Sequence, residues 1–188
     1  DQIQPKGFSL SENQNIALNK INSLFKKENV VLFKGVTSSG KTEIYITLIS
    51  KLLKSNNQVL YLVPEIALTT QLVERLKVYF SDHLVVYHSG LNINQRAELW
   101  NDLILSDKPK IIIGARSAIF LPYNNLKLII VDEEHEQTYK QYEPSPRYHA
   151  RDSSLVLANI HNSKVLLGSA TPSIESFYNC EESKKFAL

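Results

Sequence analysis

Apolar residues form short runs along this chain, and between the runs they recur at helical spacing. Short, mostly apolar runs suit strands that are buried on both faces of a sheet. Such runs occupy 30–33, 58–63, 84–87, 110–113, 126–131 and 164–167. Spacing of three and four residues predicts helices that begin at Ser11 and at about 42–53, 69–80 and 94–105. The alternation predicts an α/β fold, with a mostly parallel sheet covered by helices on both faces.

A glycine-containing run joins the first predicted strand to the helix that follows it. The run reads Gly35, Val36, Thr37, Ser38, Ser39, Gly40, Lys41 and Thr42, which fits the phosphate-binding P-loop. In that loop, backbone N–H groups surround phosphate oxygens, the lysine reaches the β and γ phosphates, and the hydroxyl holds Mg²⁺. The N-terminus of the helix adds partial positive charge. An ordinary turn is the alternative, but the order of strand, loop and helix favours phosphate binding.

An acidic motif follows the fifth predicted strand, where Asp132, Glu133, Glu134 and His135 stand in sequence. Because ligands of parallel sheets bind beyond the carboxyl ends of the strands, this motif should lie at the same edge as the P-loop. Thr42 and Asp132 are therefore candidate Mg²⁺ ligands, and Glu133 is the candidate base that orients the attacking water. A solvated acidic loop is the alternative for the motif alone. Its pairing with a P-loop favours catalysis.

Polar residues also follow the last predicted strand, where Ser169 and Thr171 stand within the sequence GSATPS. We expect both side chains to make hydrogen bonds at the sheet edge, although such residues taken singly are more often turn or cap residues. His135 has no second histidine or cysteine at ligand spacing, so we expect it to hydrogen-bond across the cleft and not to bind zinc.

Ser11 and Gln14 open the first predicted helix with the spacing of a capping box. The amide of Gln14 both donates and accepts, so it also suits the edge of an adenine base. Local sequence alone favours capping.

Length, composition and net charge limit the number of domains, the kinds of partner and the location that the sequence allows. A chain of 188 residues that is 43% hydrophobic predicts one domain with a full core. A net charge of +2 means that any nucleic-acid site must be local. The single cysteine, Cys180, and the absence of a signal peptide or membrane span predict a cytoplasmic protein with no membrane partner. The chain has no methionine, so we expect it to be part of a larger protein.

Seven motifs appear in a familiar order, namely GVTSSGKTE, VPEIALTTQ, HSGL, GARSAIFLP, IIVDEEH, YKQYEPSPRYHARD and GSATPS. They resemble the motifs of superfamily two DNA helicases, and most closely those of the primosomal replication-restart helicases, from about residue 10 to 177. The resemblance implies the first RecA-like motor lobe of a 3′ to 5′ DNA helicase that uses ATP and Mg²⁺. It also implies DNA forks, single-stranded DNA, further domains, primosome proteins and single-strand-binding proteins as partners.

The resemblance assigns roles by position. It places the adenine contact on Gln14, which reverses the local preference for capping alone. Lys41 and Thr42 take the phosphate and metal roles, and Asp132 and Glu133 take metal binding and water activation.

A second group of positions is implied to couple the state of ATP to DNA. Ser169 and Thr171 match the family's coupling motif, and His135 is grouped with them. Glu134 replaces the alanine of the commoner DEAH form, a variation that the restart helicases share.

The segment after the acidic motif interleaves aromatic and basic residues, namely Tyr139, Lys140, Tyr142, Arg147 and Tyr148. Aromatic faces among cations suit stacking on unpaired bases. Because nearby acidic residues cancel the local charge, stacking and not Coulomb attraction must provide most of the binding. Tyrosines packed on the domain surface are the alternative. The resemblance to an aromatic-rich loop that links DNA sensing to ATP hydrolysis favours the DNA role.

Four further residues are candidate contacts to DNA phosphates. Arg116 and Ser117 follow the fourth predicted strand, and Thr69 and Thr70 stand at a helix start. The alternative for the threonines is simple capping of the helix. We assign Trp100 to helix packing.

The family also has a second motor lobe that carries an arginine finger, and no such motif appears in this sequence. An arginine finger is worth roughly 10³- to 10⁵-fold in rate. We therefore expect this chain alone to bind nucleotide but to hydrolyse ATP weakly. A P-loop kinase or other transferase, and a non-catalytic binding platform, are the rival functions. A zinc site is not expected in this part of the protein.

Overall fold

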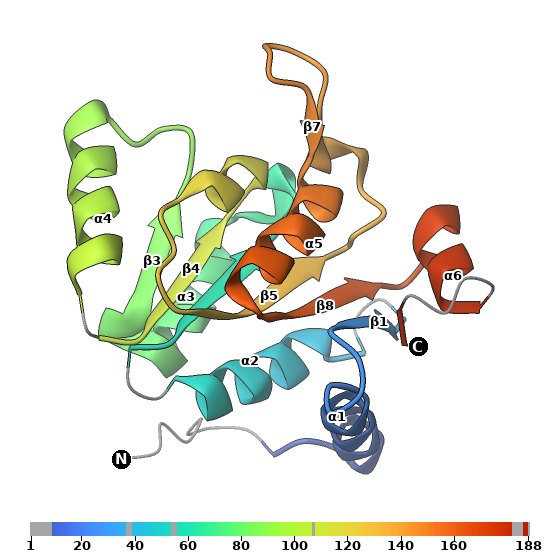
Figure 1. The fold of residues 1–188 in the computed structure, drawn as a ribbon. Helices are drawn as coiled ribbons and strands as arrows, with labels where there is room; N and C mark the ends of the chain where they lie inside the picture. Colours follow the sequence, from blue (N-terminus) through green and yellow to red (C-terminus); the bar gives the residue numbers. More distant parts are fainter. Residues whose placement is uncertain (1–8, 37–38, 54–55, 107, 182–185, 188) are drawn as a thin grey trace.

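The computed structural model describes residues 9–36, 39–53, 56–106, 108–181 and 186–187. A six-stranded parallel sheet runs through it in the order β1-β8-β5-β2-β4-β3 (Figure 1). The strands are β1 Val30–Lys34, β2 Gln58–Leu62, β3 Leu84–Tyr87, β4 Lys110–Gly114, β5 Leu126–Asp132 and β8 Lys164–Ser169. All six strands that the apolar runs predict are confirmed, and so is the mostly parallel α/β fold.

Helices cover both faces of this sheet (Figure 1). One face carries α1 (Glu12–Leu24), α2 (Lys41–Leu52) and α3 (Thr70–Phe80), and the other carries α4 (Ile93–Leu105) and α5 (Ala150–His161). These bounds agree with the four predicted helices to within one or two residues. α5 was not predicted, and neither was α6 (Ile174–Glu181), which follows β8. Short 3-10 helices occupy η1 Glu65–Ala67, η2 Ser81–His83, η3 Arg116–Phe120 and η4 Gln137–Tyr139.

Two hydrophobic cores fill the space between the sheet and its helices. In β2, Val59 and Tyr61 point into the core beneath α2 and α3, while Leu60 and Leu62 point into the core beneath α5. This alternation follows from the two-residue period of a strand. Because both faces are covered, all of β2 is buried, which explains why its sequence is a nearly unbroken apolar run.

A two-stranded hairpin projects from the body of the molecule above α5 (Figure 1). Its strands are β6 (Lys140–Gln141) and β7 (Tyr148–His149), paired antiparallel. The Gln141 side-chain amide donates to the carbonyl oxygens of Pro144 and Pro146, at 2.8 and 3.0 Å, and so closes the turn from within. The hairpin therefore holds most of the aromatic segment away from the sheet.

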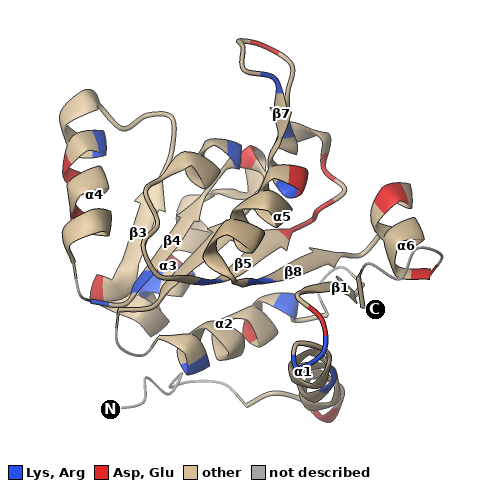
Figure 2. Ribbon diagram, viewed as in Figure 1, with Lys and Arg blue, Asp and Glu red and all other residues tan. Residues whose placement is uncertain are grey.

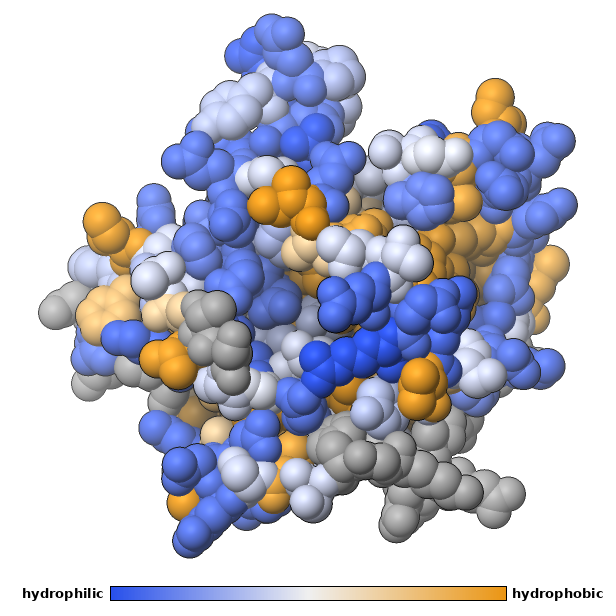
Figure 3. All heavy atoms as spheres, turned by 180° about the vertical axis from the view of Figure 1, so that it is seen from behind, coloured by the Kyte–Doolittle hydropathy of each residue, from blue (hydrophilic) through white to orange (hydrophobic). Residues whose placement is uncertain are grey.

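The outer surface is mostly hydrophilic on the side that Figure 3 shows, with hydrophobic side chains in small groups. Trp100 on α4 is 46% exposed, so its assignment to helix packing holds for only part of the side chain. Among the residues of α4 only Leu103 is buried. No helix among the described residues is long and apolar enough to cross a membrane.

Candidate nucleotide site and DNA-facing hairpin

The carboxyl ends of β1, β8 and β5 lie side by side and form the predicted functional edge. Register pairs Lys34 with Ser169 and Asp132 with Gly168, so the segments that follow these strands must meet. A pocket of about 350 Å³ opens there. It is lined by Gly40, Lys41, Thr42, Glu43, Arg75, Asp132 and Glu133.

Lys41 lies at the centre of this pocket and is only 8% exposed. Its ammonium group donates to the Gly35 carbonyl oxygen at 3.0 Å and forms an ion pair with Glu133 Oε1 at 3.1 Å. The structure therefore brings together the P-loop lysine and the candidate base, which are 92 positions apart (133 minus 41). The predicted loop residues Thr37 and Ser38 lie outside the described residues, and Val36 is exposed.

Gly40 ends the loop and begins α2 with a left-handed backbone, φ +79°. Among the described residues no side chain caps this helix start, so the first N–H groups of α2 suit an anion. A Cβ on Gly40 would lie 2.0 Å from Gln14 Nε2. The position therefore requires glycine both for its backbone and for the approach of Gln14.

Gln14 makes the predicted capping contacts and also contacts the backbone of the P-loop. Its Oε1 accepts from the Ser11 N–H at 2.8 Å while Ser11 Oγ accepts from the Gln14 N–H, so the capping box is confirmed. Its Nε2 donates weakly to the carbonyl oxygens of Ser39 and Gly40, at 3.4 and 3.3 Å. The side chain thus lies against the P-loop, where an adenine contact would have to be made.

Asp132, at the end of β5, is held by two tyrosines that the sequence did not point to. Tyr45 donates to Oδ1 at 3.0 Å and Tyr61 donates to Oδ2 at 3.2 Å. Burial, and then the negative charge of Glu133, raise the pKa of Asp132 above its usual value, although the Tyr45 hydrogen bond opposes the rise. The hydroxyl groups orient the carboxylate and leave oxygen lone pairs for a cation.

Gly168 makes this arrangement possible. A Cβ at Gly168 would lie 1.9 Å from the hydroxyl oxygen of Tyr45, so a larger residue would push the tyrosine away from Asp132. Tyr45 and Tyr61 occupy core positions of α2 and β2, where periodicity alone marks them as packing residues. Only the fold shows that their hydroxyl groups reach the site.

Glu133 adopts φ +46°, a left-handed conformation that is costly for a residue with a Cβ. The turn aims its carboxylate back at Lys41, and His135 Nδ1 lies 3.7 Å from its second oxygen. Such backbone strain persists where the surroundings enforce it, and functional sites often carry it.

His135 forms the predicted hydrogen bond across the sheet edge. Its Nδ1 lies 2.7 Å from Ser169 Oγ, and that same oxygen accepts from the Thr171 N–H at 3.0 Å. The predicted hydrogen bond of His135 is confirmed, and it joins the motifs that follow β5 and β8. Thr171 joins this contact through its backbone N–H, and the residue itself is exposed.

Glu134 forms a buried network that sequence reasoning missed. It is fully buried and accepts from the Ser173 N–H at 2.7 Å, Ser173 Oγ at 3.1 Å, Ser176 Oγ at 2.8 Å and Arg151 Nη1 at 3.2 Å. These partners belong to the start of α6 and to α5. Glu134 therefore links the acidic motif to both neighbouring helices.

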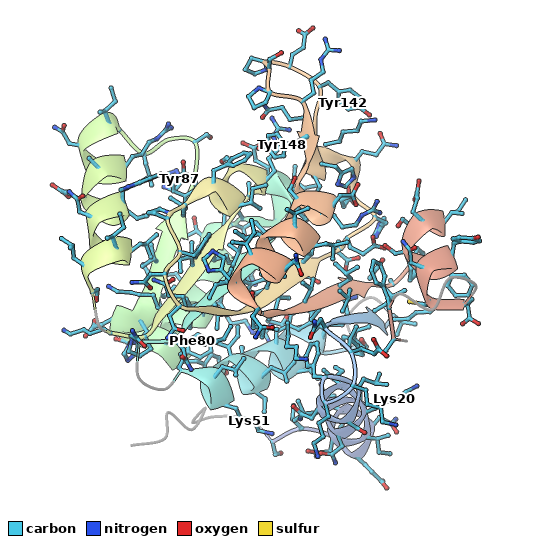
Figure 4. All side chains as sticks on the ribbon, in the orientation of Figure 1. Lys20, Lys51, Phe80, Tyr87, Tyr142 and Tyr148 are labelled. Atoms are coloured by element: carbon cyan, nitrogen blue, oxygen red, sulfur yellow. The ribbon has the colours of Figure 1, made fainter. Side chains whose placement is uncertain are left out.

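The hairpin presents one tyrosine fully and a second in part. Tyr142 is 58% exposed, and Lys140 Nζ lies 4.8 Å from its ring centroid. Tyr148 is half-buried and packs edge-on against Phe120, with the ring centroids 4.8 Å apart. Figure 4 shows Tyr142 and Tyr148 on the hairpin. Arg147 is exposed, and Figure 2 shows both signs of charge along the turn. Stacking on Tyr142 therefore remains the main prediction for this hairpin.

Tyr139 does not fit the predicted stacking role. It is 1% exposed, and its hydroxyl group donates to the carbonyl oxygens of Leu62 at 3.1 Å and Asp132 at 2.6 Å. The ring lies in the core beneath α5, because the segment turns inward before the hairpin begins. Tyr139 fixes the ends of β2 and β5, and the prediction that it contacts DNA is corrected.

The other candidate DNA contacts lie at two places. Arg116 and Ser117 are half-buried in η3, where Arg116 Nη1 donates to the Thr138 carbonyl oxygen at 3.3 Å. Thr69 and Thr70 are exposed, and Thr69 Oγ1 caps α3 by accepting from a backbone N–H at 3.3 Å. The capping alternative is thus confirmed for Thr69, and its hydroxyl group still faces solvent.

Thr42 and Asp132 both line the pocket and offer hard oxygen ligands. Mg²⁺ usually takes one or two protein oxygens together with waters and phosphates, so this donor set fits it. In the part of the chain that the structure describes, no group of three or more histidine, cysteine, aspartate and glutamate residues could hold a metal ion.

Comparison with known proteins gives the family to which the chain belongs. The family model of the DEAD/DEAH box helicases matches residues 11–179. This chain belongs to the DEAD/DEAH box helicase family.

Two curated relatives of this helicase chain carry the name Replication restart protein PriA. The Haemophilus influenzae protein is 53% identical over 156 residues, which cover 83% of the chain and 21% of that protein. The Bacillus subtilis protein is 43% identical over 190 residues, or 97% of the chain and 23% of that protein.

The helicase chain thus spans about a fifth of the length of these relatives (21% and 23%). Among solved structures, RecG bound to a three-way DNA junction matches with a TM-score of 0.66 at 20% identity, over 95% of the chain and 23% of RecG. A DEAD box protein from Methanococcus jannaschii matches with a TM-score of 0.62 at 19% identity, over 96% of the chain and 53% of that protein. These likenesses show the RecA-like helicase fold.

Proposed function

We propose that this chain is the ATP-binding motor lobe of a PriA-type 3′ to 5′ DNA helicase that acts in replication restart and primosome assembly. One observation carries the proposal: Lys41, Asp132 and Glu133 converge on one pocket in a chain 53% identical to a replication restart protein. The proposal includes one domain, a cytoplasmic location, and DNA forks and single-stranded DNA as substrates. It also includes further domains, primosome proteins and single-strand-binding proteins as partners.

The pocket's residues divide the work of phosphoryl transfer. Lys41 exchanges Glu133 for the β and γ phosphates of ATP, while backbone N–H groups of the loop hold the phosphates. Thr42 and Asp132 would hold Mg²⁺, which when bound neutralises phosphate charge. Glu133, released from Lys41, orients the attacking water and accepts its proton. Gln14 contacts the adenine base.

His135, Ser169 and Thr171 couple DNA binding to the nucleotide site. His135 and Ser169 join the ends of the neighbouring strands β5 and β8, so a shift of one segment moves the other. The hairpin residues Lys140, Tyr142, Arg147 and Tyr148 bind unpaired bases and backbone. Thr69, Thr70, Arg116 and Ser117 bind DNA phosphates. Thr171 supports the coupling through its backbone contact to Ser169.

The isolated chain should bind nucleotide but hydrolyse ATP weakly, because an arginine finger from a second lobe contributes roughly 10³- to 10⁵-fold in rate. Robust hydrolysis by the 188-residue chain, stimulated by DNA, would contradict this part of the proposal.

The test uses a full-length protein that carries this domain, with ATP hydrolysis and fork unwinding measured in parallel. Glu133→Gln should abolish both activities and retain nucleotide binding, whereas Tyr142→Ala should lower the stimulation of hydrolysis by single-stranded DNA. Normal hydrolysis by Glu133→Gln would remove the assigned base. Transfer of phosphate to a small acceptor without any DNA effect would favour a kinase, and unwinding that survives Lys41→Ala would favour a passive platform.

A further inference from the structure

Two charged residues of the nucleotide pocket have no role in the mechanism above. Glu43 follows the P-loop in the first turn of α2, and Arg75 reaches the pocket from the middle of α3. Their side chains form an ion pair across the space between the two helices. The Arg75 side chain is 45% exposed and that of Glu43 is 22% exposed, so the pair lies at the mouth of the pocket.

The position of the pair places it where a nucleotide would lie. Glu43 Oε2 is 2.9 Å from the point that a Cβ on Gly40 would occupy, so the carboxylate rests against the P-loop itself. Arg75 lines the same pocket as Lys41 and the candidate metal ligand Asp132.

The charges of the pocket lining are paired. The lining contains two cations and three carboxylates, and each cation is engaged by a carboxylate: Lys41 by Glu133, and Arg75 by Glu43. A bound triphosphate offers several oxygens of higher charge density than one carboxylate. The planar fork of a guanidinium matches phosphate oxygens well.

We propose that Arg75 is a nucleotide-binding residue that exchanges Glu43 for the triphosphate of ATP, and that Glu43 competes for Arg75 when the pocket holds no nucleotide. This inference rests on the proposed function, since it requires the P-loop to bind a nucleoside triphosphate. It has a consequence for α3, which begins at its cap residue Thr69 and at Thr70. ATP would hold the middle of this helix through Arg75 while DNA phosphates contact its N-terminal end, so each ligand favours the same placement of α3.

The experiment measures binding of a fluorescent, non-hydrolysable ATP analogue to this chain by anisotropy in the presence of Mg²⁺. Arg75→Gln should weaken binding about five- to tenfold, as expected for a charge-assisted hydrogen bond at a partly exposed site. Glu43→Gln should strengthen binding, because it removes both a competitor and a negative charge. In the Arg75→Gln background, Glu43→Gln should increase the affinity less, because Glu43 then has no arginine to bind.

Lys77→Gln is the matched control, because it removes a cation from the same helix whose partner, Glu74, is exposed on α3. It should bind the analogue as the wild type does. Wild-type affinity in Arg75→Gln, an equal loss in Lys77→Gln, or weaker binding by Glu43→Gln would each overturn the proposal.

Lys41→Ala separates this inference from the proposed function. If Lys41→Ala binds as tightly as wild type, the P-loop is not the nucleotide site and the proposed function fails. If Lys41→Ala loses binding while Arg75→Gln keeps it, the pocket binds nucleotide and only the role of Arg75 fails.

Discussion

Replacing Glu134 by alanine should destabilise the fold strongly, although the residue has no proposed role in binding nucleotide or DNA. The carboxylate is fully buried and receives four hydrogen bonds, from Ser173, Ser176 and Arg151. Alanine would leave the Arg151 guanidinium, which is 10% exposed, without its buried partner. It would also release the N–H at the start of α6.

The size of the effect follows from these contacts. Breaking a buried ion pair by removing one partner costs about 3–5 kcal/mol. Arg151 keeps Asp152 at 2.8 Å and Ser173 Oγ at 2.6 Å, so the loss should fall near the lower end of that range. A loss of about 3 kcal/mol corresponds to a fall in Tm of roughly 6–12 °C for a domain of this size. Glu134→Gln keeps the shape of the side chain, so the free energy of unfolding should fall by about half as much, roughly 1–2 kcal/mol.

Thermal and urea unfolding, followed by circular dichroism, measure the loss. Glu74→Ala is the matched control, because its ion pair with Lys77 is on the surface, where substitutions usually change stability by less than about 0.5 kcal/mol. If Glu134→Ala loses less than about 1 kcal/mol, the buried network does not hold α5 and α6 to the acidic motif, and the reasoning fails.

Three further outcomes are expected. Asp132→Asn should raise the free energy of unfolding at neutral pH, because burial raises the pKa of Asp132 in the folded state; urea unfolding should show the gain fading as pH falls through that raised pKa toward the unfolded value of about 3.9. Gly168→Ala should cost about 1–3 kcal/mol in chemical denaturation, through its overlap with Tyr45, and less when Tyr45→Phe accompanies it. Tyr142→Ala should weaken single-stranded DNA binding at least fivefold by anisotropy, since stacking is worth about 1–3 kcal/mol per base, whereas Tyr139→Phe should leave it unchanged.

The pattern of the sequence predicts the sheet and the P-loop well for physical reasons. Buried parallel strands must be apolar on both faces, and phosphate binding requires glycines, a lysine and a hydroxyl at fixed spacing. Gly40, Lys41 and Asp132 are therefore visible without coordinates. α5 is not, because its buried face consists of the small or polar residues Ala150, Arg151, Ser154 and Ala158, while its large apolar residues Val156 and Ile160 are exposed.

The supporting residues of the site escape sequence reasoning because they depend on contacts between distant elements. Tyr45 and Tyr61 occupy positions whose spacing indicates only core packing, and Tyr139 stands among cations yet turns inward. Glu134 and Arg151 meet only because α5 returns over β5. A linear pattern gives the residue types and their periods, but it does not say which side chains meet across the sheet edge.

We expect the pocket at the end of β1 and β5 to bind a nucleoside triphosphate through Lys41. Calorimetry can measure this binding by titrating a non-hydrolysable ATP analogue with Mg²⁺ into the wild type, Lys41→Ala and Glu133→Gln. The titrations should give one site per chain, a loss of about ten- to a hundredfold in affinity for Lys41→Ala, and retained binding in Glu133→Gln. Equal affinity of the wild type and Lys41→Ala would show that the nucleotide does not bind through Lys41.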